Sequence, residues 1–335
     1  MKRTLQRVLA TLALTAAPWV ALAGEATVSL VFAGDVVLDD APGALIAAGG
    51  DPFAAFAPLF KSADLRIANL ECVVATTGKV ADKMFTFRAH PRTLPVLKRH
   101  FDAVPVANNH TGDFGREAFA EMLGLLKQQG LAQFGGGYNL AQAHTPLMFE
   151  RKGVRIALLG YNEFMPRSFE ADANAPGSAW SEDEQVVADI QRARSEFKAD
   201  VVIPVMHWGW ENEPTANDRQ RQLARTMVDA GADAVMGGHP HVTQDIEHYR
   251  GKPIIYSVGN FVMKESDNAQ QRLGWVLRLH LDKTGVTAFD THVARLNLKG
   301  IPKSDPTSPS PCWSRGQSSV EQCRAGVHLA AAQKQ

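Results

Sequence analysis

Residues 232–241 read ADAVMGGHPH: a short apolar run ends in two glycines, which are followed by two histidines on either side of a proline. The apolar run predicts a buried strand. The loop after this strand contains two histidines, and packing in a core would not explain why both are there. Taken alone, two histidines separated by one residue are moderate evidence for a metal site. Their weight depends on whether the same pattern occurs elsewhere in the chain.

The pattern recurs along most of the chain. Apolar runs that end in polar side chains occupy residues 27–35, 64–71, 102–110, 154–163 and 200–211. Between them, residues 51–63, 114–130, 182–198 and 217–230 have the apolar spacing of helices. Alternating strands and helices predict an α/β fold. Because ligands bind at the carboxyl ends of strands in such folds, we expect the polar residues to meet at one edge.

Seven of these polar residues form the candidate active site: Asp35, Glu71, Asn109, His110, His207, His239 and His241. Carboxylates, an amide oxygen and imidazoles suit Mn, Fe or Zn better than Ca or Mg. A bridging carboxylate would allow one or two divalent ions. Each element alone has an ordinary explanation: a capped turn, a polar loop or a packed histidine. The recurrence in five ordered segments favours the metal site.

The chain changes character after residue 244. Residues 253–263, 274–282 and 286–298 have strand signals with little helix between them, which predicts an antiparallel finishing sheet. Residues 301–335 are rich in Pro, Ser and Gln, and we expect a weakly ordered tail there. Residues 24–300 then form a single domain.

Residues 1–23 have the basic start, short apolar stretch and small-residue end of a cleaved signal peptide, which predicts a periplasmic or secreted protein without a stable membrane anchor. An uncleaved anchor is the alternative, but the apolar stretch is too short to span a bilayer. In an oxidising compartment Cys312 and Cys323 are expected to form a disulfide, with free thiols as the alternative.

The charge balance excludes one class of partner. The chain has 35 basic and 35 acidic residues, with no basic run and no alternation of basic and aromatic residues. Binding to nucleic acid requires several cations that neutralise phosphates. We therefore expect no nucleic-acid partner.

Four phrases, ANNHTGDFG (107–115), HWGWE (207–211), GADAVMGGHPHV (231–242) and YSVGNF (256–261), make the chain resemble the CapA family, which is associated with poly-γ-glutamate capsule biosynthesis. That family lies within the calcineurin-like metallophosphoesterase fold, so the resemblance implies a four-layer α-β-β-α sandwich with a metal site at one edge. It further implies that Asp35 is the first ligand, Glu71 the bridging carboxylate and Asn109 an amide ligand before a catalytic His110. His207, His239 and His241 then complete the metal set.

The sequence departs from the wider metallophosphoesterase pattern at two positions. Val37 stands where that pattern has a histidine, and Glu71 stands where it has an aspartate. One metal position is therefore expected to be weaker or differently ligated. Asp39 or Asp40 are candidates to compensate, with a solvated turn as the alternative for both.

Five further residues are candidates for contact with the substrate or the ligands. Arg88, His90 and Glu211 are candidates to meet an anionic or zwitterionic substrate, Trp208 to wall the pocket, and Asn260 to lie in a tight turn near the site. Ordinary surface or packing roles are the alternative for all five.

Two functions from different classes fit these observations. The first is a metal-dependent hydrolase that cleaves a phosphoester, or an amide bond of an anionic envelope polymer, with His110 as general acid. The second is a non-catalytic accessory protein that binds poly-γ-glutamate or a synthase partner in a capsule-synthesis complex. The complete ligand set favours the hydrolase.

Overall fold

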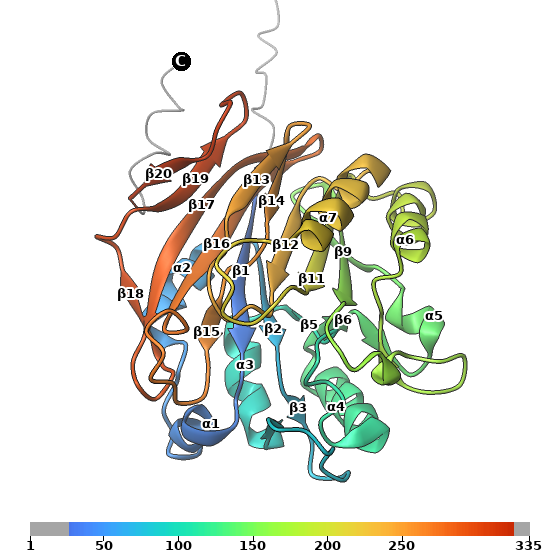
Figure 1. The fold of residues 1–335 in the computed structure, drawn as a ribbon, viewed down its shortest axis with the longest axis vertical. Coiled ribbons are helices and arrows are strands. Elements are labelled where there is room, and N and C mark those ends of the chain that lie inside the picture. Colours follow the sequence, from blue (N-terminus) through green and yellow to red (C-terminus); the bar gives the residue numbers. More distant parts are fainter. Residues whose placement is uncertain (1–26, 325–335) are drawn as a thin grey trace, which may run out of the picture.

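A computed structural model describes residues 27–324, which contain two large β-sheets packed face to face (Figure 1). In spatial order the first sheet contains β20 (Glu321–Cys323), β19 (Ser310–Ser314), β17 (Gly285–Leu296), β16 (Leu273–Asp282), β1 (Val28–Val36), β2 (Leu65–Leu70), β5 (Ala103–Pro105) and β6 (Ala132–Phe134), with β15 (Asn260–Val262) on β1 and β18 (Pro302–Asp305) on β17. The second contains β13 (Ile246–Tyr249), β14 (Lys252–Ile255), β12 (Val235–Gly238), β11 (Val201–His207), β9 (Val154–Asn162) and β8 (Leu147–Arg151). Two short pairs, β3 (Val73–Val74) with β4 (Arg88–Ala89) and β7 (Gly136–Gly137) with β10 (Gly177–Ser178), lie outside them.

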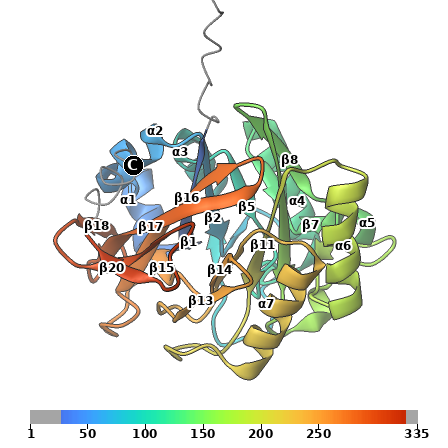
Figure 2. The same cartoon turned by 90° about the horizontal axis from the view of Figure 1, so that it is seen from above.

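Helices cover the outer face of each sheet. Over the first sheet lie α1 (Asp40–Ala47), α2 (Ala57–Ser62), α3 (Leu94–His100) and α4 (Gly115–Gln129), and over the second lie α5 (Leu140–Ala143), α6 (Asp183–Ser195) and α7 (Asp218–Ala230). Figure 2 shows α1–α3 and α6–α7 on opposite sides of the sheets. The four-layer α-β-β-α sandwich expected from the sequence is confirmed.

Strand β1 shows why the central strands are apolar along their whole length. Leu30 and Phe32 point into the core between the two sheets, whereas Val31 and Ala33 point into the core beneath the helices. Successive side chains of a strand face opposite sides, and both sides of this strand are buried. A strand buried on both faces is a continuous apolar run rather than an alternating one.

The finishing strands are antiparallel only in part. Strands β16 and β17 form the expected antiparallel hairpin beside β1. In contrast, β14 pairs antiparallel with β13 but parallel with β12 in the second sheet, and β15 runs parallel to β1 in the first, so the antiparallel expectation is wrong for β15 and for one side of β14. The chain crosses from one sheet to the other between them. This crossing brings Asn260 to the same edge as Asp35, its partner in the register of β1 and β15.

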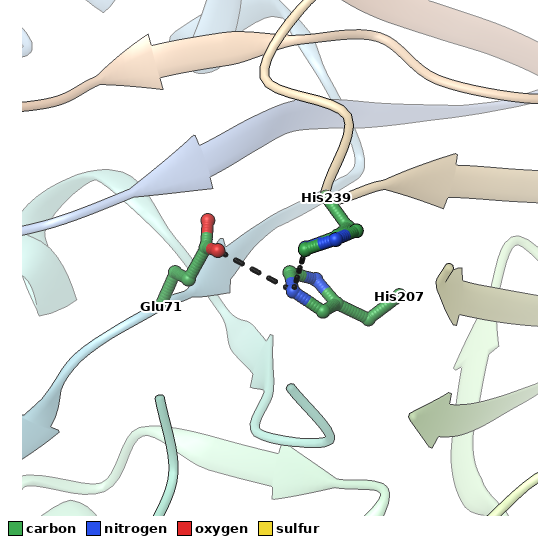
Figure 3. Close-up of side chains that lie close together, drawn as sticks. All are labelled: Glu71, His207 and His239. Atoms are coloured by element: carbon green, nitrogen blue, oxygen red, sulfur yellow. Dashed lines mark hydrogen bonds and ion pairs between the residues drawn. The ribbon is translucent and has the colours of Figure 1, made fainter. Parts of the chain in front are cut away.

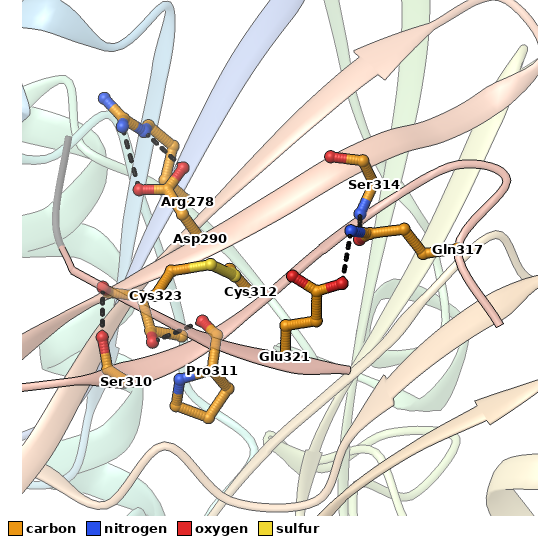
Figure 4. Close-up of a disulfide and its surroundings, with 10 residues drawn as sticks. Arg278, Asp290, Ser310, Pro311, Cys312, Ser314, Gln317, Glu321 and Cys323 are labelled. Atoms are coloured by element: carbon orange, nitrogen blue, oxygen red, sulfur yellow. Dashed lines mark hydrogen bonds and ion pairs between the residues drawn. A yellow bond between two sulfur atoms is a disulfide. The ribbon is translucent and has the colours of Figure 1, made fainter. Parts of the chain in front are cut away.

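The expectation of a weakly ordered tail is wrong for the part of it that the structure describes. Strands β18 and β19 pair with β17, and β20 pairs with β19, which extends the first sheet. Backbone hydrogen bonds to an open strand edge do not require an apolar composition, which is why composition alone misled. A disulfide joins Cys312 in β19 to Cys323 in β20 (Figure 4). Residues 325–335 lie outside the described residues.

The expected signal peptide, residues 1–23, also lies outside the described residues. Within residues 27–324, none of the helices combines the length and apolar character needed to cross a membrane.

Candidate metal centre

Four strands deliver side chains to the same edge of the sandwich. Asp35 is the penultimate residue of β1, and Glu71 directly follows β2, which runs parallel to β1. His207 is the last residue of β11, and His239 directly follows the parallel strand β12. Each sheet therefore contributes two of these residues from the carboxyl ends of neighbouring parallel strands. The arrangement is the one that the sequence predicted for strand ends.

Glu71, His207 and His239 form the first candidate ligand group, and Figure 3 shows their side chains directed toward one another. Their ligand atoms all lie within 4.8 Å of each other. His207 Nε2 lies 3.3 Å from Glu71 Oε1 and 3.1 Å from His239 Nδ1. Asn109 Oδ1 approaches the same nitrogen to 2.7 Å. Glu71 Oε1 and Asn109 Oδ1 are oxygen acceptors that converge on one ring nitrogen, and a cation in this place would satisfy their lone pairs.

Asp35, Glu71 and His241 form a second group of the same size. His241 Nδ1 lies 3.6 Å from Asp35 Oδ2, and His241 Nε2 lies 3.7 Å from Glu71 Oε1. Glu71 belongs to both groups, which is the geometry of a carboxylate that bridges two ions. Glu211 forms a third group with His239 and His241 and is exposed, so it lies at the mouth of the cluster.

Three buried atoms of the cluster lack a hydrogen-bond partner within residues 27–324: both carboxylate oxygens of Glu71 and Nε2 of His239. A buried carboxylate without a partner is strongly destabilised. Burial, reinforced by the charge of Asp35, raises the pKa of Glu71 well above its usual range. These orphaned donor atoms fit a divalent ion of the Mn, Fe or Zn type.

The imidazoles of His207 and His239 are held in the neutral form that binds metal, whereas burial of His241 is outweighed by the charges of Glu71 and Asp35, which raise its pKa. Burial lowers the pKa of His207 to about 3. Burial, together with the neighbouring His207 and His241, holds the pKa of His239 well below its usual range. Neutral imidazoles have a free lone pair, whereas protonated ones cannot ligate a cation.

The glycines and histidines of residues 237–241 have a geometric explanation. His239 and His241 have φ values of 94° and 58°, a region that non-glycine residues rarely adopt. A Cβ on Gly238 would lie 2.5 Å from Asp35 Oδ1, so only glycine allows this close approach. The backbone N–H of His239 donates to Asp35 Oδ2 at 3.1 Å. Strained backbone of this kind is typical of functional sites.

His110 is held beside the cluster by a carboxylate that the sequence analysis did not single out. Its Nδ1 lies 2.7 Å from Asp113 Oδ2, and its ring packs 4.3 Å from the ring of Phe87. Lys83 contacts the other oxygen of Asp113. Burial lowers the pKa of His110 to about 4 in spite of Asp113. The neutral ring therefore keeps its proton on Nδ1, and Nε2 remains a proton acceptor.

Two asparagines that the sequence analysis also missed support the ligands. Asn69 Nδ2 donates to Asp35 Oδ1 at 2.8 Å, and Asn108 Nδ2 donates to Asn69 Oδ1 at 3.2 Å. Asn108 and Asp113 lie inside the ANNHTGD phrase, and Asn69 lies two residues before Glu71. Their place in the same phrases as the ligands was the available signal. Supporting hydrogen bonds of this kind orient metal ligands.

A cavity of about 180 Å³ adjoins the cluster. It is lined by Phe85, Phe87, His110, Glu211, His241, Asn260, Met263, Lys264, Glu265, Ser266 and Gln271. Asn260 Oδ1 lies 2.9 Å from His241 Nδ1, so this residue orients a candidate ligand as well as lining the cavity. Of the five further candidates for contact with the substrate or the ligands, Glu211 and Asn260 thus lie beside the cluster.

The other three of these five candidates lie elsewhere. The guanidinium of Arg88 stacks over Phe114 at 4.2 Å, and His90 Nδ1 accepts the backbone N–H of Arg92. Arg88 and His90 line a separate cavity beside α1, because they lie in or directly after β4 rather than a strand of the two large sheets. Trp208 is buried under α7, where its indole donates to Tyr256 O at 2.8 Å, so it is a packing residue.

Comparison with known proteins identifies the family. Residues 29–265 match the family described as bacterial capsule synthesis protein PGA_cap. The chain belongs to this family, the CapA family. It is 37% identical over 246 residues to the PGA biosynthesis protein CapA of Bacillus subtilis (71% of this chain, 64% of the relative) and 31% identical over 261 residues to the capsule biosynthesis protein CapA of Bacillus anthracis (73% and 61%). A probable polyglutamine synthesis accessory protein of Mycobacterium tuberculosis is 31% identical over 214 residues (59% and 55%).

The matched region spans less than two thirds of the length of each of these three relatives. Among solved structures, a hypothetical protein from Thermus thermophilus has a TM-score of 0.52 at 19% identity, covering 79% of this chain and 98% of that one. At this identity the likeness shows a shared fold alone.

This CapA family member does not restore the histidine that is missing at Val37. The Val37 side chain is fully buried in the core beneath the helices. Asp39 caps α1 and accepts the backbone N–H of Arg88, and Asp40 is exposed. Within residues 27–324 neither aspartate joins a candidate ligand group, so a turn and cap role describes both.

Proposed function

We propose that this chain is a metal-dependent hydrolase that acts on an anionic polymer of the cell envelope, in the synthesis or processing of poly-γ-glutamate. The observation that carries the proposal is the buried group of Glu71, His207 and His239, whose orphaned atoms match the needs of a divalent cation. The names of the CapA relatives support the polymer, because two of them refer to PGA or capsule biosynthesis.

The ligands divide between two metal positions. Glu71, His207 and His239, with the amide oxygen of Asn109, would hold one ion. Asp35 and His241 would hold the other, with Glu71 as the shared carboxylate. Divalent ions bound there would supply Lewis acidity, lower the pKa of a coordinated water and offset negative charge on the reacting group.

His110 moves a proton at its Nε2 atom. Asp113 fixes the tautomer by holding Nδ1, and the open face of the ring lines the cavity beside the cluster. In the neutral form Nε2 would accept the proton that the attacking water gives up, and the protonated ring would then donate this proton to the leaving group. This is the general acid role expected from the resemblance, with the uptake of the proton as a required first step.

Metal analysis of the purified protein, followed by assays with a phosphodiester, a phosphomonoester and a γ-glutamyl amide, tests the proposal. We expect one to two divalent ions per chain and turnover of at least one substrate class. An active protein without bound metal would contradict the mechanism.

A non-catalytic accessory role is the second candidate function, and the name of the Mycobacterium tuberculosis relative favours it. Metal binding combined with γ-glutamyl binding and no turnover would establish that role instead.

The proposed location is the periplasm or the exterior, after removal of residues 1–23. N-terminal sequencing of the protein from an expressing bacterium is expected to begin at Gly24. A mature protein that retains Met1 would contradict export by signal cleavage.

A further inference from the structure

Three charged side chains around the cavity beside the cluster have no ion-pair partner within residues 27–324. They are Lys264, Glu211 and Glu265. Two other partly buried lysines are paired, since Lys83 contacts Asp113 and Lys252 contacts Asp233, whereas Lys98 on α3 forms no ion pair with the residues that the structure describes. Unpaired charges of both signs therefore lie around one cavity. Such charges are typical of a binding site in which a ligand with both charges forms the missing ion pairs.

Aromatic rings hold the cation of this cavity in place. Lys264 Nζ lies 4.1 Å from the ring centre of Phe85 and 5.3 Å from that of Phe87, both within the range of cation–π attraction. Phe87 also packs against His110. The ammonium group therefore lies in the same wall of the cavity as the proposed proton donor.

The carboxylates belong to loops that are tied together near the cluster. Gln271 accepts a hydrogen bond from Ser266 and donates one to Asn212, which links the segment after β15 to the residue that follows Glu211. Glu211 also belongs to a candidate ligand group with His239 and His241. The negative charge thus lies between the metal cluster and the outer part of the cavity.

We propose that this cavity binds the zwitterionic end of a γ-linked glutamyl chain, with the α-carboxylate on Lys264 and the α-ammonium on Glu211 or Glu265. Only the amino-terminal residue of such a chain has both groups free on one carbon atom. Its γ-carbonyl is then directed to the neighbouring cluster. A phosphodiester has no cation for the two carboxylates, so they would repel it. This inference rests on the proposed function and specifies its substrate class.

Calorimetric binding of γ-glutamylglutamate to the purified protein tests the inference, with two analogues as probes. One analogue has a carboxamide in place of the first α-carboxylate, and the other is N-acetylated. We expect each analogue to bind about 10-fold to 100-fold more weakly than the dipeptide, the usual effect of removing a charged hydrogen-bond partner. Equal binding of the three, or no binding of the dipeptide, would overturn the inference.

Lys264→Met keeps an unbranched apolar side chain at this position and removes the charge that lies over Phe85. We expect it to weaken dipeptide binding about 10-fold or more and to leave carboxamide binding unchanged, while Lys61→Met on the distant helix α2 changes neither. Circular dichroism checks the fold of Lys264→Met, and Lys264→Gln provides a second neutral variant. Dipeptide binding by both neutral variants at the parent affinity would overturn the role of Lys264.

Metal content measured on the same samples separates the two proposals. Discrimination between the probes by a protein that binds no metal would support the binding inference and contradict the hydrolase. A metal-loaded protein that turns over a phosphodiester but does not discriminate between the probes would support the hydrolase and contradict the binding inference.

Discussion

Gly238 shows how one missing side chain shapes the cluster. Because its Cβ would overlap Asp35 Oδ1, we expect Gly238→Ala to lower the free energy of unfolding by about 1–3 kcal/mol and to weaken metal binding. The control is Gly124→Ala in α4, where the nearest atom to the new Cβ is 3.7 Å away. That change is expected to stabilise the protein by up to about 1 kcal/mol. Urea unfolding of both variants measures the difference, and equal effects would contradict the steric argument.

Asn109 and His110 are neighbours with different expected roles. Asn109→Ala removes an oxygen 2.7 Å from His207 Nε2 and is expected to lower metal affinity and activity together. His110→Ala is expected to leave metal content unchanged and to lower turnover by ~10² to 10⁴, the usual contribution of an acid or base. Titration of the metal and kinetics with a substrate whose leaving group needs no protonation measure both. Loss of metal in His110→Ala would show that His110 is a ligand.

At the residue scale, the sequence located the side chains that come together and missed those that orient them. Asp35, Glu71 and His239 were predictable because each follows an apolar strand. Asp113 and Asn69 were not singled out, since their partners lie on other segments or depend on a local turn. Arg88 and Trp208 were misplaced for the opposite reason: a charged or aromatic residue near a motif says nothing about the direction of its side chain.

At the element scale, the apolar runs predicted the central strands, and the helical spacing of residues 114–130 predicted α4. Gly130, with a φ of 68°, ends α4 at the expected residue. The short strands β18–β20 escaped prediction because their order comes from pairing, of β18 and β19 with β17 and of β20 with β19. The two parallel pairings of β14 and β15 also depend on the crossing between sheets, which no local pattern records.

The hairpin of β16 and β17 contains a charged group that makes stability depend on pH. Burial opposes ionisation of Asp290, but the hydrogen bond with His280 and the close contact with His292 Nε2 outweigh it. The bidentate contact with Arg278 adds to them, and the pKa of Asp290 lies well below its usual range (Figure 4).

A carboxyl group with a lower pKa in the folded state stabilises the fold above its unfolded pKa of about 3.9 and loses that contribution as pH falls. We expect Asp290→Asn to cost about 3 kcal/mol near pH 7. The gap between parent and variant is expected to narrow below about pH 4, where the unfolded carboxylate begins to protonate while the folded one stays ionised. Unfolding free energies at pH 7, 5 and 3 measure this. A gap that is constant over this range would contradict the depressed pKa.

At the scale of the whole molecule, the cluster joins the two sheets. Asp35 and Glu71 come from the first sheet, and His207 and His239 from the second. An ion bound between them is expected to stabilise the entire fold, by about 2.7 kcal/mol when its free concentration is 100 times Kd. Thermal unfolding with and without a chelator measures this effect. In His239→Ala the chelator is expected to have little effect, and an equal shift in both proteins would place the stabilising ion elsewhere.

The most direct test of the metal centre is a crystal structure of the protein grown with Zn²⁺, with anomalous data collected at the zinc edge. We predict a peak that lies ~2.0–2.2 Å from Glu71, His207 and His239, and, where a second ion binds, another peak between Asp35 and His241. Anomalous density that is absent from this edge of the sandwich, or found only at surface residues, would contradict the assignment of these strand ends as a metal centre.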